Sequence, residues 1–201
     1  MTLLARSFFF SFVIVLSCTP ASEDSSSLSI EEEVNQLQTD EEKTKYLEQI
    51  LADDQRVRNH EGSELMLKYG QDSPEYMEYV RTLWKQDELN LKKIETFLAI
   101  HGYPQEAWGH EATTAPWMVI HHAQGYDVRY RNFEQIYEAF LEGNIDDGAV
   151  TFYLGRMYEM RFGDRLMMEN PYTAEQEILA LVEKLELQDL VASAERSAKV
   201  E

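Results

Sequence analysis

Apolar side chains recur every three or four residues along most of the chain after residue 30, the spacing that gathers them on one face of an α helix. No stretch alternates apolar and polar residues between tight turns, as the strands of a sheet would. The spacing predicts an all-α protein, a single-domain bundle of about six helices joined by short loops, in residues 30–201.

Capping and stop signals set the expected limits of these helices. Ser73 followed by Pro74 is typical of a helix start, and Gly102 of a helix end. Pro116 is compatible with a helix from about Thr113 because it would lie in the first turn. The expected helices cover residues 39–58, 73–100, 113–124, 132–141, 145–161 and a last helix from 173, with short helical pieces at 30–37 and 63–68.

The expected helix from Thr113 is apolar nearly all round and contains two adjacent histidines, His121 and His122. A helix without a polar face has no side to expose to solvent, so we expect it to be the buried centre of the domain. Because neighbouring side chains on a helix diverge by about 100°, the two histidines are not expected to share a metal ion.

Polar residues interrupt the apolar stripes of three other helices. They are Asp54 and Arg58 in the first helix, Asp87 and Asn90 in the second, and Arg156 in the helix from 145. Burying an unpaired charge costs several kcal/mol, so such groups must pair with one another, with a ligand or with water. We therefore expect one interior polar cluster, with Asp87 facing Arg156 and with His122 at its edge.

Several short motifs occur in an order that resembles an uncharacterised family of bacterial all-helical proteins, over about residues 50–170. The motifs are Asp54-Gln55-x-x-Arg58, Asp87-x-x-Asn90, Gly102-x-Pro104, Gly109, Trp117, His122-Ala123 and Arg156. The resemblance implies that Gln55, Trp117 and His121 belong to the same site as the polar cluster, either as ligand-binding or as structural residues.

The chain departs from the family pattern at three places. It has His121 where the family has glutamine, Gly155 where the family has aspartate, and no Gln-Tyr-Gly segment after Gly163. The resemblance therefore implies a ligand site that is altered in this protein. The family has no assigned activity, so the resemblance does not name a reaction.

The first 17 residues have the features of a signal peptide. Arg6 precedes an apolar run from Ser7 to Leu16, which is too short to span a bilayer. The run ends in Val-Leu-Ser-Cys18, which is similar to the lipobox of bacterial lipoproteins, and Cys18 is the only cysteine in the chain. We expect a lipid on Cys18 to anchor the protein in the cell envelope, in the outer membrane, with residues 18–29 as a flexible serine-rich and acidic tether. The alternative is an ordinary secretory signal.

Charge excludes some partners. The chain has a formal net charge of −19. Arg6 is the one charged residue among residues 1–17, so removal of this segment makes the protein slightly more acidic. A strongly acidic protein repels nucleic acid and anionic lipid headgroups, so we expect no nucleic-acid partner.

No motif names a reaction. The sequence contains no H-E-x-x-H, C-x-x-C or G-x-S-x-G pattern and no glycine-rich phosphate loop, so no metal and no cofactor is expected. Three hypotheses remain. The cluster binds a small polar ligand or an envelope protein, it supplies an Asp/His acid–base pair to a hydrolase or lyase, or it only fixes helix packing in an envelope scaffold. For a scaffold, the candidate contact is an exposed basic and aromatic surface formed by Tyr126, Arg129, Tyr130, Arg131 and Phe133. The alternative, which we favour, is that these residues pack a long loop against the domain.

Overall fold

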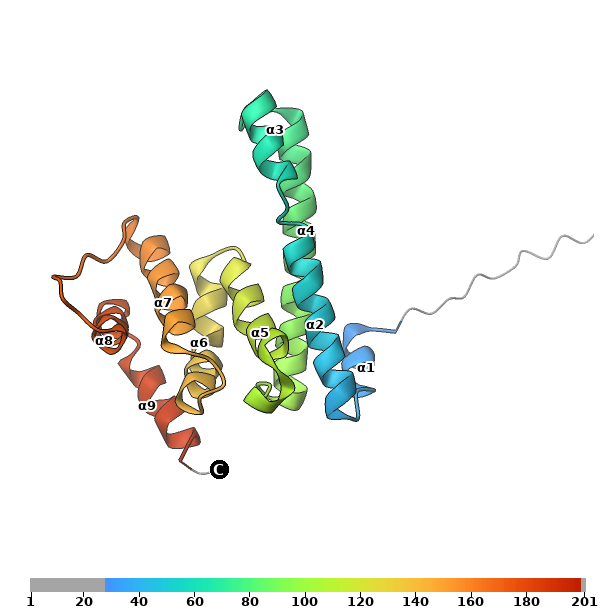
Figure 1. The fold of residues 1–201 in the computed structure, drawn as a ribbon. Helices are drawn as coiled ribbons and strands as arrows, with labels where there is room; N and C mark the ends of the chain where they lie inside the picture. The colour runs from blue at the N-terminus through green and yellow to red at the C-terminus, as the bar shows by residue number, and fades with distance from the viewer. Residues whose placement is uncertain (1–27, 200–201) are drawn as a thin grey trace, which may run out of the picture.

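The computed structural model describes residues 28–199, and within them it contains nine α helices, one 3-10 turn and no strand (Figure 1). The elements are α1 (Ile30–Asn35), α2 (Asp40–Arg56), α3 (Glu61–Tyr69), α4 (Pro74–His101), η1 (Glu106–Trp108), α5 (His110–His122), α6 (Tyr126–Leu141), α7 (Asp147–Phe162), α8 (Ala174–Leu185) and α9 (Gln188–Ser197). The predicted all-α fold is confirmed.

The predicted signal peptide, Cys18 and the tether up to residue 27 lie outside the described residues. In the described part of the chain, no helix combines the length and the apolar character needed to cross a membrane.

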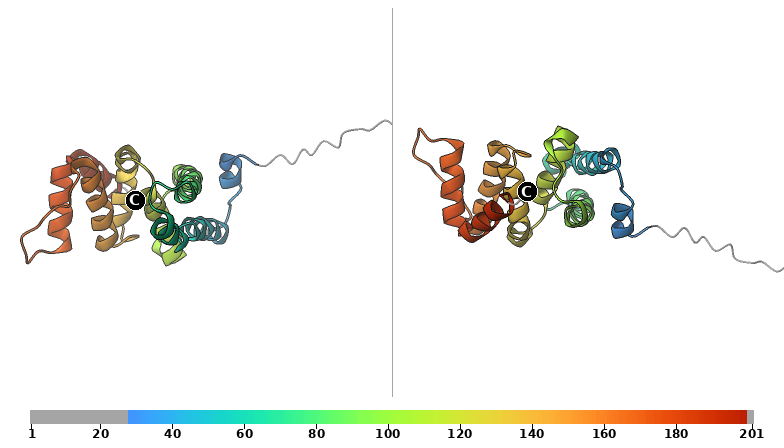
Figure 2. Two further views of the ribbon diagram at one scale, coloured as in Figure 1. Left: turned by 90° about the horizontal axis from the view of Figure 1, so that it is seen from above. Right: turned by 90° about the horizontal axis from the view of Figure 1, so that it is seen from below.

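The helices lie side by side roughly in chain order, from α1 at one end to α8 and α9 at the other (Figures 1 and 2). Helix α5 occupies the middle of this row, where it packs against α2 and α4 on one side and α6 and α7 on the other. Its side chains Ala112, Ala115, Val119 and Ile120 are buried in the core. The expectation that this helix is the buried centre is therefore confirmed.

The limits of α5 differ from the expected ones. It begins at His110, so Pro116 lies inside the helix and not in its first turn. It ends at His122, and Gly125, with φ of 91°, is the residue that precedes the first turn of α6. Glycine suits this position because a positive φ is costly for residues with a Cβ atom.

Side-chain caps fix the starts of α2, α4 and α8, as the sequence predicts. The hydroxyl of Ser73 accepts a hydrogen bond from the Tyr76 backbone amide at the start of α4. Thr39 and Thr173 form capping boxes with Glu42 and Gln176 at the starts of α2 and α8. These caps satisfy amide groups that have no partner within the helix.

Two helical segments were not expected from the sequence. Helix α6 begins at Tyr126, six residues before the expected start at Asn132, and α9 follows α8 after a short turn. Both segments are rich in polar residues, and the helices they belong to pack against each other and, for α6, also against α5 and α7. Most helical stability in proteins comes from such tertiary packing.

The predicted inward stripe of α7 is wrong. The buried side chains are Val150, Tyr153, Leu154 and Met157, whereas Phe152 is 57% exposed and Arg156 is also exposed. Helix α7 carries apolar side chains on more than one side, so its periodicity alone does not identify the buried face.

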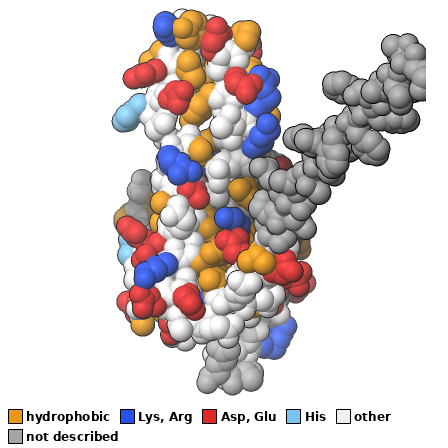
Figure 3. All heavy atoms as spheres, turned by 90° about the vertical axis from the view of Figure 1, so that its right-hand side faces the viewer, with side chains coloured by type: hydrophobic (Ala, Val, Ile, Leu, Met, Phe, Trp, Pro, Cys, Tyr) orange, Lys and Arg blue, Asp and Glu red, His pale blue; other side chains and the backbone are white. Residues whose placement is uncertain are grey.

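The first half of α4 projects beyond the other helices with only α3 alongside it (Figure 1). Gly62 of α3 lies against the ring of Tyr79, whose hydroxyl donates a 2.8 Å hydrogen bond to the backbone carbonyl of Val57. Figure 3 shows this projection at the top of the molecule, with acidic, basic and apolar side chains intermingled on its surface.

Candidate functional site

A buried carboxylate, Asp54, lies near the end of α2 and accepts hydrogen bonds from three side chains. Its Oδ1 atom accepts from Nη1 of Arg58 at 2.8 Å, and its Oδ2 atom accepts from Nε2 of Gln55 at 2.8 Å. Nδ1 of His122, on α5, lies 2.9 Å from Oδ2. Both oxygens of this buried carboxylate therefore have hydrogen-bond partners.

Arg58 joins this carboxylate to a second buried acid. Its Nη2 atom donates to Oδ1 of Asp87, on α4, at 2.6 Å. Burial raises the pKa of Asp87 above its ordinary value, although Arg58 acts in the opposite direction. Oδ2 of Asp87 has no hydrogen-bond partner within residues 28–199. The guanidinium of Arg58 thus donates hydrogen bonds to two carboxylates. Residues from α2, α4 and α5 converge as expected.

Asn90 lies one turn after Asp87 on the same buried face of α4. Its side-chain oxygen accepts a 2.8 Å hydrogen bond from Nε2 of Gln86, while its Nδ2 atom has no acceptor in the described part of the chain. Asn90 is therefore interior, as predicted, but its one recorded partner is on its own helix.

His122 connects the cluster to a cavity of about 710 Å³. The cavity lies between the end of α5, helix α7 and the segment that leads into α8; its lining includes His121, His122, Arg129, Phe152, Gly155, Arg156, Arg165, Tyr172 and Glu177. The His122 side chain is 22% exposed and uses Nδ1 for Asp54. Its other ring nitrogen has no hydrogen-bond partner among residues 28–199 and is not buried.

His121 forms a wall of the same cavity and is held by aromatic contacts. Its ring stacks on Phe152 at 4.3 Å between centroids and meets the edge of Trp117 at 6.4 Å. It is 8% exposed, and Nδ1 has no partner from the residues that the structure describes. Burial lowers the pKa of His121 to about 3, and the neighbouring Arg129 and His122 act in the same direction. His121 is therefore neutral at physiological pH.

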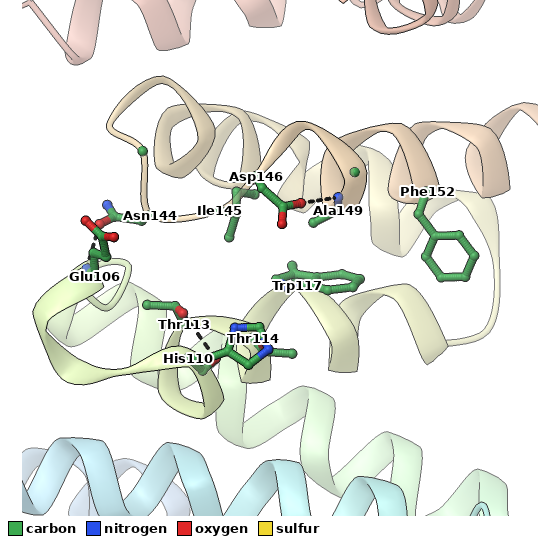
Figure 4. A pocket seen from close by; sticks show the side chains of 12 residues that line it. Glu106, His110, Thr113, Thr114, Trp117, Asn144, Ile145, Asp146, Ala149 and Phe152 are labelled. Atoms are coloured by element: carbon green, nitrogen blue, oxygen red, sulfur yellow. Dashed lines mark hydrogen bonds between the residues drawn. The ribbon is translucent and has the colours of Figure 1, made fainter. Parts of the chain in front are cut away.

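Trp117 lies on the other side of Phe152, in a second cavity of about 600 Å³. Figure 4 shows its ring between α5 and α7, with Ile145, Asp146 and Ala149 above it and Phe152 at one end. The sequence grouped Trp117 with the polar cluster. The structure instead places Trp117 in this second cavity. Its ring contacts the ring of His121, which also lines the cavity beside the polar cluster.

Arg156 does not join Asp87, and that prediction is wrong. Its side chain is exposed on α7 and donates a 2.7 Å hydrogen bond to Glu159 one turn later. The error follows from the misassigned face of α7. Arg156 nevertheless lines the cavity beside His122.

Arg129, a member of the candidate exposed surface, is instead almost completely buried on α6. Phe133 is also buried, and of the five residues only Tyr130 and Arg131 are exposed, so the candidate surface is not formed and the packing alternative holds for Arg129 and Phe133. A predicted helix that began just after Gly125 would have indicated the burial of Arg129. In such a helix Arg129, Phe133 and Ile136 follow one another at the spacing of one buried face.

Within residues 28–199, no group of three or more histidine, cysteine, aspartate or glutamate residues is arranged to hold a metal ion. No known family, curated protein or solved structure matches the chain. The resemblance to the uncharacterised bacterial family therefore stays a prediction, and the site geometry is the basis for the function proposed below.

Proposed function

We propose that this protein binds a small polar ligand in the cavity of about 710 Å³ beside His122. The observation that carries the proposal is the position of His122: a buried carboxylate, Asp54, holds one ring nitrogen while the ring itself borders the cavity. Cavities of a few hundred cubic ångströms with a small number of oriented polar groups are typical of small-molecule sites.

The buried network supports binding because it orients the ring. Asp54 is held by Gln55 and Arg58, and Arg58 is held in turn by Asp87. A side chain whose supporting groups are themselves fixed loses little conformational entropy when it contacts a ligand. Charges that only fixed helix packing would not need to end at an accessible imidazole.

A cavity-filling variant tests this proposal. Gly155 lines the cavity, and a Cβ atom added there would meet no atom within 4 Å. We expect Gly155→Leu to place an alkyl side chain in the cavity and to keep α7 helical, since leucine favours helix more than glycine does.

The measurement is the melting temperature with glucose, glycine, citrate, inorganic phosphate or spermidine added in turn. A compound that binds the folded state raises the melting temperature. We expect at least one of these compounds to stabilise the wild type and not Gly155→Leu. Equal shifts in both proteins, or none in either, would contradict binding in this cavity.

The same pair of residues supports a second candidate, a hydrolase or lyase. A carboxylate bonded to one nitrogen of a histidine orients the other nitrogen for proton transfer, which is the arrangement of a general base. Turnover of p-nitrophenyl acetate or p-nitrophenyl phosphate by the wild type, lost in His122→Gln and kept in His60→Gln, would favour this candidate. Binding without turnover would favour the first.

A lipid on Cys18 is proposed as the means by which the protein is held in the cell envelope. The support is the Val-Leu-Ser-Cys18 sequence after an apolar run, in a chain with no other cysteine. Labelling with an alkyne analogue of palmitate should mark the wild type and not Cys18→Ser. Absence of label from the wild type, together with its recovery in the aqueous phase of a detergent partition, would rule the anchor out.

A further inference from the structure

Arg129 is a buried cation without an anionic partner in the described part of the chain. It is 1% exposed, and its Nη1 atom donates to the backbone carbonyls of Ala123 at 2.9 Å and Gly125 at 3.2 Å and lies 3.1 Å from Sδ of Met160. Its Nε atom is buried with no acceptor among residues 28–199. The hydrogen-bond partners of this guanidinium, which lines the cavity, are therefore all neutral groups.

Such an arrangement is costly for the protein alone. Burying a charge without a counter-charge is unfavourable, because carbonyl groups replace only part of its hydration. Burial lowers the pKa of Arg129 to about 10, so the side chain still carries its charge at physiological pH. An anion in the cavity would supply the missing counter-charge.

The other charges of the cavity do not supply it. Glu159 is engaged by Arg156 at 2.7 Å. Arg165, on the segment after α7, has no recorded side-chain partner within the described residues. Glu177 is the remaining acid of the lining, which also contains two cations without an acidic partner among residues 28–199, Arg129 and Arg165. This excess of positive charge occurs in a chain whose formal net charge is −19.

We infer that the ligand is a small anion whose carboxylate or phosphate group is bound by Arg129 and Arg165. This inference rests on the proposed function, since it names the chemical class of the ligand for the same cavity. Guanidinium groups are suited to the role because their donors match the spacing of carboxylate and phosphate oxygens. The cavity, at about 710 Å³, has room for more than the anionic group alone.

Isothermal titration calorimetry of the purified protein in a low-salt, chloride-free buffer tests the inference. The probes are citrate, a carboxylate, and inorganic phosphate, with glucose and spermidine as neutral and cationic counterparts. We expect citrate or phosphate to bind saturably and glucose and spermidine not to bind. Comparing citrate with phosphate identifies which anionic group the site prefers.

Two variants locate the binding. Arg165 lies on an exposed segment. Arg165→Gln should weaken anion binding about tenfold, which is the usual effect of losing one charge-assisted hydrogen bond. Arg131→Gln is the matched control, because Arg131 is two positions from Arg129 but is exposed and bonded to Glu95 outside the cavity. We expect it to leave binding unchanged.

The outcomes separate this inference from the proposed function. Binding of glucose or spermidine that Gly155→Leu abolishes, without anion binding, would overturn the inference and leave the proposed function intact. Anion binding that neither Arg165→Gln nor Gly155→Leu weakens would place the anion elsewhere and overturn the inference. Failure of every probe to bind would count against both.

Discussion

Nδ1 of His122 lies 2.9 Å from Oδ2 of Asp54, which joins the end of α5 to the end of α2 across 68 positions of sequence. Arg58 extends this contact to Asp87, so three helices meet at one polar point. The point is buried on the side of Asp54 and accessible on the side of His122. Its effects on stability and on binding can therefore be measured separately.

Loss of the Asp54 charge should destabilise the fold. In Asp54→Asn, Arg58 loses one of its two carboxylates, and the amide presents a donor where the carboxylate accepts from Arg58, Gln55 and His122. We expect the free energy of unfolding to fall by about 3 kcal/mol, the usual effect of breaking a buried ion pair. Urea denaturation measures this change.

The neighbouring acid provides the control for that variant. Asp53 pairs with Arg56, whose side chain is 68% exposed, on the outer side of α2. Asp53→Asn should cost less than about 1 kcal/mol, as exposed pairs usually do. Equal losses in the two variants would contradict the special position of Asp54.

Buried His121 should make the protein less stable in acid. Its folded-state pKa, about 3, lies below its unfolded value near 6.5, so the unfolded chain binds the extra proton between these values. This contribution to stability is complete above pH 6.5 and is lost as pH falls through that value towards 3. Between pH 7 and pH 5 the loss is about 2 kcal/mol.

His121→Phe isolates this effect, because phenylalanine keeps an aromatic ring against Phe152 without the titrating group. We expect the difference in unfolding free energy between variant and wild type to grow in favour of the variant as pH falls from 7 to 5. Using the difference also cancels much of the opposite contribution of Asp87, whose raised pKa stabilises the folded state on protonation. His60→Gln, at an exposed histidine, should show no such trend.

The contact between α3 and α4 depends on the lack of a side chain at Gly62. A Cβ atom there would overlap the ring of Tyr79, whose hydroxyl is fixed by the carbonyl of Val57. We predict that Gly62→Ala lowers the free energy of unfolding by about 1–3 kcal/mol, as overpacking does.

Gly155→Ala is the matched comparison for Gly62→Ala because it is also a glycine within a helix but has open space at the Cβ position. It should raise stability by about 0.5 kcal/mol. A stabilising Gly62→Ala, measured by the same urea titration, would show that α3 does not pack on α4 as described.

The sequence predicted the parts of the fold that depend on local chemistry. Ser73, Thr39 and Thr173 mark helix starts because their hydroxyls accept from backbone amides, and this works whatever the tertiary structure. The convergence of Asp54, Arg58 and Asp87 was also predictable, because both α2 and α4 have a single apolar face that these residues interrupt.

The cavity could not be predicted in the same way. Arg156 was assigned to the interior because α7 has apolar residues on several sides, and only packing against α6 and α8 selects the buried one. Arg129 was not assigned to the cavity because a helical segment with several polar residues resembles a loop until its neighbours are known. Arg165 and Tyr172 reach the cavity from a segment without regular structure, which has no periodicity to follow.

The most direct test is nuclear magnetic resonance of the histidine side chains during a titration with citrate. Our account predicts a saturable change in the imidazole signals of His122, little change at His110 in the second cavity or at exposed His60, and loss of the change at His122 in Gly155→Leu. Signals of His122 that stay constant, or that change no more than those of His60, would contradict a ligand site at the end of α5.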